Sequence, residues 1–142
     1  MGPRILLVDD EQEFVLTLAE RLRMRDMDSH AVFDGSAALE QVHSHPPRIL
    51  IIDLKMPGMD GIQVLKQVKQ THPGIHIIIL TGHGSEQDKI NCMNLGAFAY
   101  FQKPVDIDRL SAAIRQGYET ALSDERETAA RDRYLGTGSP SP

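Results

Sequence analysis

The chain has little of what would place it outside the cell or in a membrane. Its 142 residues include one cysteine and no tryptophan. The lone Cys92 cannot form an internal disulfide bond, which fits a reducing compartment. Apolar stretches such as 49–52 and 77–80 are far too short to span a bilayer, and residues 1–4 lack the layout of a signal peptide. We therefore expect a cytoplasmic protein with no membrane attachment.

Clustered positive charge is also missing. The chain carries 20 acidic and 15 basic residues, a formal charge of −5, and its lysines and arginines form no cluster. Proteins that bind nucleic acids usually present a basic face, so we do not expect direct nucleic-acid binding. A hydrophobic content of 41% is enough for the core of one domain of ordinary size.

Apolar runs alternate with amphipathic stretches along most of the chain. The runs predict strands at 4–8, 29–32, 48–53, 75–80 and 99–102. The stretches predict helices near 14–22, 36–42, 62–68 and 85–96, with a last helix opening at 107. Alternating strands and helices are typical of a parallel sheet with helices on both faces. The sequence therefore predicts an α/β fold of three layers.

Polar residues follow four of the five predicted strands. Asp9 and Asp10 follow the first, Asp53 the third, Thr81 the fourth and Lys103 the fifth. Parallel strands end at one edge of a sheet, where ligands bind in such folds. Two carboxylates ~4 Å apart repel each other by ~4 kcal/mol at an effective dielectric constant near 20. A divalent cation resolves that repulsion, and oxygen ligands favour Mg²⁺.

Four segments carry a specific resemblance. Residues 8–11 (VDDE), 52–61 (IDLKMPGMDG), 80–82 (LTG) and 100–104 (YFQKP) resemble the signature segments of CheY-like response-regulator receiver domains. The resemblance covers roughly residues 4–120. It implies a doubly wound, flavodoxin-like (βα)5 fold around a five-stranded parallel sheet. It also implies a phosphoacceptor of two-component signalling, which is phosphorylated and dephosphorylated itself and is not a turnover enzyme.

The resemblance assigns the metal and the phosphoryl group to particular residues. Asp53 would accept a phosphoryl group from the phosphohistidine of a sensor histidine kinase or a histidine phosphotransfer protein. Mg²⁺ would be bound by Asp10, by Asp53 and by the backbone carbonyl of Lys55. Asp9 would hold the metal through water. The phosphoryl group would contact Thr81 and Lys103.

Three further positions have roles in switching and in the lifetime of the phosphoryl group. Tyr100 would be the aromatic switch residue, turning inward as Thr81 moves toward the phosphate. Lys55 and His83 lie two residues after Asp53 and Thr81, and we expect their side chains to slow hydrolysis. By the same resemblance, the readout surface would extend over about 85–122, and a homodimer could form through it.

After the receiver domain, the sequence indicates a charged extension and a tail. We place the receiver domain at 1–122 and a charged, helix-compatible extension after it, to about 134. The Gly/Ser/Pro-rich end, 136–142, has the composition of a disordered tail. The extension has too few apolar positions to support a long coiled coil. The chain could be a stand-alone receiver or part of a longer protein with an effector domain, and the sequence leaves both open.

The same residues also fit other interpretations. Asp9 and Asp10 could simply cap the first helix, and Tyr100 could be a packing residue. A Mg²⁺-dependent phosphohydrolase would need a second carboxylate two residues after Asp53, where Lys55 stands, and a cap over the site. A flavin-binding electron carrier would need a neutral phosphate loop at 9–11, which is acidic here. A degenerate receiver acting only as a docking module remains the main alternative.

Overall fold

One parallel sheet forms the centre of the molecule. A computed structural model describes residues 2–131 and 133. The strands are β1 (Arg4–Val8), β2 (Asp28–Val32), β3 (Ile49–Ile52), β4 (His76–Thr81) and β5 (Ala99–Gln102). They pair in the order β2-β1-β3-β4-β5, and every pair is parallel. This is the strand order of flavodoxin-like folds, so the predicted fold class is confirmed.

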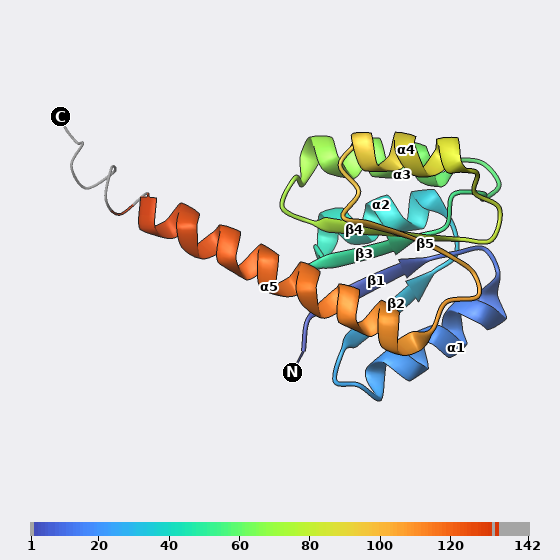
Figure 1. Cartoon of the computed structure of the whole chain (residues 1–142), viewed down its shortest axis with the longest axis horizontal. Coiled ribbons are helices and arrows are strands. Elements are labelled where there is room, and N and C mark those ends of the chain that lie inside the picture. Colours follow the sequence, from blue (N-terminus) through green and yellow to red (C-terminus); the bar gives the residue numbers. More distant parts are fainter. Residues whose placement is uncertain (1, 132, 134–142) are drawn as a thin grey trace.

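Helices cover both faces of the sheet (Figure 1). They are α1 (Gln12–Arg23), α2 (Gly35–Ser44), α3 (Gly61–Thr71), α4 (Glu86–Asn94) and α5 (Ile107–Arg131). Apolar side chains of α1 and α5 pack on one face, and those of α2, α3 and α4 pack on the other. The three-layer arrangement expected from the alternating sequence is therefore present.

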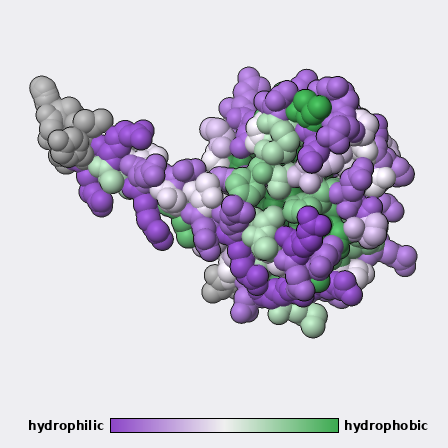
Figure 2. All heavy atoms as spheres, viewed as in Figure 1, coloured by the Kyte–Doolittle hydropathy of each residue, from purple (hydrophilic) through white to green (hydrophobic). Residues whose placement is uncertain are grey.

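Helix α5 continues well beyond the body of the domain (Figure 1). Ala121 is its last buried residue, and the surface of the projecting part is mainly hydrophilic (Figure 2). Glu125 forms an ion pair with Arg48, which precedes β3. The helix crosses the proposed domain boundary at 122 without interruption. The predicted disordered tail, 136–142, lies outside the described residues.

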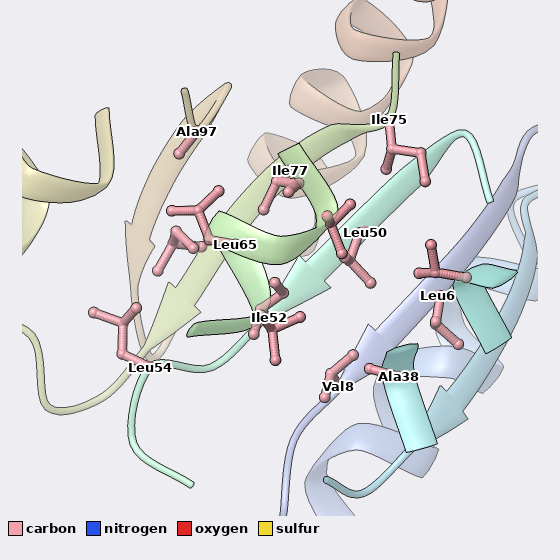
Figure 3. Close-up of a cluster of buried hydrophobic side chains, with 14 of the residues drawn as sticks. Leu6, Val8, Ala38, Leu50, Ile52, Leu54, Leu65, Ile75, Ile77 and Ala97 are labelled. Carbon is pink, nitrogen blue, oxygen red and sulfur yellow. The ribbon is translucent and has the colours of Figure 1, made fainter. Parts of the chain in front are cut away.

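Successive residues of the central strands enter opposite cores. Leu6, Leu50 and Ile77 lie in the core under α2, α3 and α4 (Figure 3). Their neighbours Ile51 and Ile78 lie in the core under α1 and α5. Strand side chains alternate between faces, so a strand buried on both sides must be apolar throughout. This requirement explains the uninterrupted runs of isoleucine and leucine in the sequence.

Local signals set several helix ends. Ser85 and Asp88 form a capping box at the start of α4, and Gly96, with φ of 102°, follows its end. Gly35 is the first residue of α2, which Asp34 caps. Gly117 lies within α5. It is buried there, and a Cβ atom built on it would lie 3.0 Å from Ile49 Cδ1, so it allows α5 to approach β3 closely.

No helix among residues 2–131 is both long enough and apolar enough to cross a membrane.

Candidate acidic site at the carboxyl edge of the sheet

Backbone hydrogen bonds hold the site residues just beyond the strands. The amide of Asp53 donates to Val8 O at 3.0 Å, and the amide of Lys103 donates to Thr81 O at 2.9 Å. These bonds continue the ladders of the parallel sheet by one step. The ends of β1, β3, β4 and β5 are therefore fixed relative to one another, which is what a site assembled from four strand ends requires.

Three carboxylates meet at this edge. One oxygen each of Asp9, Asp10 and Asp53 lies within 4.8 Å of the others. Asp9 and Asp53 are each only 3% exposed, whereas Asp10 is exposed to solvent. The convergence predicted from the sequence is thus observed. It places two carboxylates in surroundings where an unpartnered charge is costly.

Lys103 is the cation that partners the two buried carboxylates. Its Nζ donates to Asp9 Oδ2 at 2.7 Å and to Asp53 Oδ2 at 3.3 Å. A third bond goes to Glu11 Oε1 at 2.9 Å, and the Phe14 ring centroid lies 4.3 Å from the ammonium. Glu11 and Phe14 were missed from the sequence. Glu11 follows the Asp pair directly, so a run of three acidic residues was the available signal.

Burial and pairing pull the pKa values of this cluster in opposite directions. Burial raises the pKa of Asp9 above its ordinary value, more than the hydrogen bonds from Lys103 and the Glu11 amide lower it. Burial acts to lower the pKa of Lys103, but hydrogen bonds to Asp9 and Glu11 and the charge of Asp53 raise it overall. The contacts of Lys103 thus favour its charged form, whereas burial disfavours the charged form of Asp9.

Asp9 also contacts the start of α1. Its Oδ1 accepts from the Glu11 amide at 2.9 Å, while Glu11, at the N-cap position, makes no side-chain cap bond. The alternative in which the Asp pair only caps this helix thus accounts for one oxygen of Asp9. Its other oxygen is bound to Lys103.

Two short loops bring the remaining predicted residues to the site. Thr81 is fully buried, and its Oγ1 accepts from the His83 amide at 3.3 Å. Asp53 Oδ1 accepts from the Lys55 amide, also at 3.3 Å. The side chains of Lys55 and His83 are exposed. Their backbone amides thus contact Asp53 and Thr81, while their side chains are in contact with solvent.

A glycine brings α3 against the loop beside Asp53. A Cβ atom built on Gly61 would lie 2.3 Å from the backbone oxygen of Asp53 and 2.8 Å from Leu54 Cα. The chain bends at 57–59, where Gly58 has a φ of 76°. The bond between Lys103 and Pro104 is cis.

Tyr100 points into the protein. It packs against the core under α3 and α4, and its hydroxyl is buried with no hydrogen-bond partner among the described residues. Burial raises the pKa of this phenol, and the acidic groups of Asp88 and others add to the effect. The inward orientation that the switch role requires is thus accessible to the ring. Cys92, also in this core, is a buried packing residue.

The donor set suits a magnesium ion. Asp9, Asp10 and Asp53 supply the hard oxygen atoms that Mg²⁺ prefers, and the exposed Asp10 leaves the cluster open to water, which Mg²⁺ retains when bound. The carbonyl of Lys55 belongs to the loop that directly follows Asp53. The cluster therefore fits the metal that the sequence predicted.

Comparisons with known proteins agree on one family. A model of the response regulator receiver domain matches residues 5–115. Sporulation initiation phosphotransferase F of Bacillus subtilis (strain 168) is 36% identical over 117 residues, which cover 82% of this chain and 94% of that protein. The DNA-binding transcriptional regulator NtrC of Escherichia coli (strain K12) is 35% identical over 123 residues. That match covers 87% of this chain, which spans about a quarter (25%) of the length of NtrC.

Solved structures give the same result. The signal receiver domain of a putative Luxo repressor protein from Vibrio parahaemolyticus superimposes with a TM-score of 0.83 at 29% identity, covering 88% of this chain and 96% of that one. The receiver domain of Francisella response regulator 1452 gives 0.79 at 28% identity, covering 84% and 98%.

Proposed function

This chain belongs to the response regulator receiver domain family, and we propose that it is a phosphorylation switch whose phosphoacceptor is Asp53. The donor is the phosphohistidine of a sensor histidine kinase or of a histidine phosphotransfer protein. The observation that carries this proposal is the buried Asp53 carboxylate between two further aspartates and Lys103. The receiver family generally binds Mg²⁺ at such an acidic pocket.

The transfer needs a nucleophile and a way to balance charge. A carboxylate oxygen of Asp53 attacks the phosphorus atom, the P–N bond of the phosphohistidine breaks, and its electron pair stays on the imidazole. The product is an acyl phosphate on Asp53. Phosphoryl transfer depends mainly on positioning and on neutralising the equatorial oxygens, which is the role of Lys103 and of the Thr81 hydroxyl.

The metal would be held by Asp10, Asp53 and the Lys55 carbonyl, with Asp9 acting through water. When bound, Mg²⁺ neutralises charge on the transferred group and orients it. Among the protein's own residues, Lys103 supplies the permanent positive charge. Its ammonium already lies 3.3 Å from the accepting carboxylate.

Lys55 and His83 would set the lifetime of the acyl phosphate. Their backbone amides bond to Asp53 and Thr81, and their side chains are exposed to the solvent from which hydrolytic water must approach. Replacing both with alanine should shorten the half-life of the phosphorylated protein, measured as phosphate release after the donor is removed. An unchanged half-life would contradict this role.

The readout surface would be formed by α4, β5 and α5. A change from 1:99 to 99:1 between two conformations requires ~5.5 kcal/mol of differential stabilisation. Phosphorylation adds about −1.5 to −2 charges beside Lys103 and Thr81, a perturbation of suitable size. This surface could also mediate a homodimer. The similarity to a sporulation phosphotransferase supports a relay of the phosphoryl group to a further histidine.

The decisive experiment measures phosphorylation directly. The protein is incubated with Mg²⁺ and acetyl phosphate, and its intact mass is recorded beside Asp53→Asn. The matched control is Asp26→Asn, the same chemical change at an exposed turn residue with φ of 63°, which asparagine tolerates. We expect one metal-dependent adduct in the wild type and the control, and none in Asp53→Asn.

Two other results would redirect the proposal. An adduct that persists in Asp53→Asn would mean that another residue is the acceptor. No adduct in the wild type, under conditions that phosphorylate a known receiver, would favour the docking-module alternative. Hydrolysis of the acyl phosphate frees Asp53 again, so the donor is consumed no faster than the acyl phosphate decays, and rapid turnover of small phosphate esters is not expected.

A further inference from the structure

Tyr100 occupies a space that exists because residue 84 is glycine. A Cβ atom built on Gly84 would lie 1.6 Å from the Tyr100 hydroxyl oxygen and 2.9 Å from Cζ of the same ring. The same built atom would lie 2.9 Å from Thr81 Cγ2. One missing methyl group therefore makes room for the aromatic ring and borders the threonine of the acidic site.

Gln102 holds the loop that carries this glycine. Its side-chain Nε2 donates to Gly84 O at 2.9 Å, linking the end of β5 to the loop between β4 and α4. Gln102 lies two residues after Tyr100 and directly before Lys103. The amide of Lys103, which follows β5, donates to Thr81 O. The end of β5 is therefore bonded both to the residue before the loop and to Gly84 within it.

We propose that Gly84 and Gln102 are positioning residues that form a seat for the inward ring of Tyr100. Gly84 provides the space, and Gln102 fixes the loop so that the space stays open. The link to signalling rests on the proposed function, because the seat borders Thr81. The seat itself does not depend on it.

The unpartnered hydroxyl makes this seat sensitive to loop position. Tyr100 Oη is buried without a hydrogen-bond partner among the described residues, and buried hydroxyl groups normally have one. The inward ring is therefore held by packing and by the shape of the loop. A displacement of the loop that closes the space would expel the ring.

The first test adds the missing methyl group. Gly84→Ala should force Tyr100 outward, whereas the control Gly82→Ala should not, because a Cβ atom there would meet only Lys103, at 3.8 Å or more. Two readouts follow the ring by NMR. The nuclear Overhauser effect between the Tyr100 ring and the Thr81 methyl group should disappear in Gly84→Ala and persist in Gly82→Ala.

The second readout is the ionisation of the phenol. Burial raises the pKa of Tyr100 in the wild type, so in Gly84→Ala it should fall toward the ordinary value of about 10. Tyr100→Phe assigns the signal. An unchanged ring contact and an unchanged pKa in Gly84→Ala would overturn the seat.

A double-mutant cycle checks that Gly84 acts through Tyr100. If the added methyl group conflicts only with this ring, Gly84→Ala should be destabilising in the wild type and nearly neutral when Tyr100 is replaced by alanine. An equal loss of stability in both backgrounds would show that the methyl group disturbs the loop in another way, and would refute the assignment.

Gln102 is tested by removing its donor in two ways. Leucine keeps the bulk and glutamate keeps the polarity, but neither can donate to Gly84 O. Both variants should increase hydrogen exchange at 83–85 by a similar factor and weaken the contact between Tyr100 and Thr81. If either variant exchanges its 83–85 amides at the wild-type rate, Gln102 does not position the loop.

The seat and its link to signalling are tested by separate experiments. The seat is measured without a phosphodonor and stands or falls on the Gly84 and Gln102 variants alone. The link to signalling requires that Gly84→Ala still be phosphorylated, by intact mass, while phosphorylation alters the α4 and β5 resonances of the wild type and no longer those of the variant. Equal responses in both would overturn the link. An absent adduct in the wild type would instead contradict the proposed function.

Discussion

Replacing Lys103 with methionine should strongly destabilise the metal-free protein. Its ammonium lies 2.7 Å from Asp9 and 3.3 Å from Asp53, so at an effective dielectric constant near 20 the attractions are about 6 and 5 kcal/mol. The two carboxylates lie within 4.8 Å of each other and repel by at least about 3.5 kcal/mol. Desolvation of the lysine offsets much of the gain. A net loss of about 3–5 kcal/mol is typical when one partner of a buried pair is removed.

The stability lost in the Lys103→Met variant should also depend on pH. The pKa of Asp9 is raised in the folded protein, so its contribution to stability is complete below the unfolded pKa and is lost as the pH rises through the folded pKa. Removing Lys103 takes away a hydrogen bond and a charge that lower this pKa. The variant should therefore lose stability more steeply than the wild type as the pH rises above about 4, the ordinary pKa of an aspartate.

Urea unfolding in EDTA at several pH values measures both effects. Asp9→Asn should recover part of the loss in the Lys103→Met background, because it removes one uncompensated charge. The control Lys66→Met removes an exposed lysine from α3 and should change the free energy of unfolding by less than about 0.5 kcal/mol. A loss below about 1 kcal/mol for Lys103→Met, with no recovery by Asp9→Asn, would refute the charge balance described here.

Three further changes test the framework around the site. Gly61→Ala should cost about 1–3 kcal/mol by urea unfolding, because its Cβ would overlap the Asp53 backbone, whereas Gly74→Ala, where the space is open, should be neutral; equal effects would contradict this. Ser85→Ala should cost about 1 kcal/mol through loss of the α4 cap, and a neutral result would show that the cap is dispensable. Arg48→Ala should cost at most about 1 kcal/mol, because its ion pair is partly exposed; a larger loss would mean that it anchors α5.

Much of the fold could be predicted because its central strands, β1, β3 and β4, are buried on both faces. Runs such as 49–52 and 77–80 are uniformly apolar, and burial on both faces requires this. Strand ends were less certain, since the ladder hydrogen bonds continue past the apolar runs. β4, for example, includes Thr81, whereas the prediction stopped at Leu80. Polarity marks where a strand leaves the core, not where its pairing stops.

The sequence indicates which residues meet at the site, but not how they contact one another. Asp53, Thr81 and Lys103 stand at strand ends, and parallel topology alone brings strand ends together. The contact of Glu11 with Lys103 depends on where the chain turns into α1, and the role of Gly84 depends on the rotamer of Tyr100. Neither follows from periodicity or spacing, because both are set by side-chain geometry across the sheet.

The three carboxylate partners of Lys103 differ in how firmly they hold it. Asp9 and Asp53 have side chains only 5% and 3% exposed, so their attraction to the ammonium is weakly screened. The side chain of Glu11 is 62% exposed, and solvent-exposed pairs of this kind contribute between 0 and about 1 kcal/mol. A phosphoryl group on Asp53 would therefore compete first with Glu11 for a Lys103 hydrogen bond. The exchange can proceed while Asp9 still anchors the ammonium, so Lys103 need not leave the site to serve the phosphorylated form.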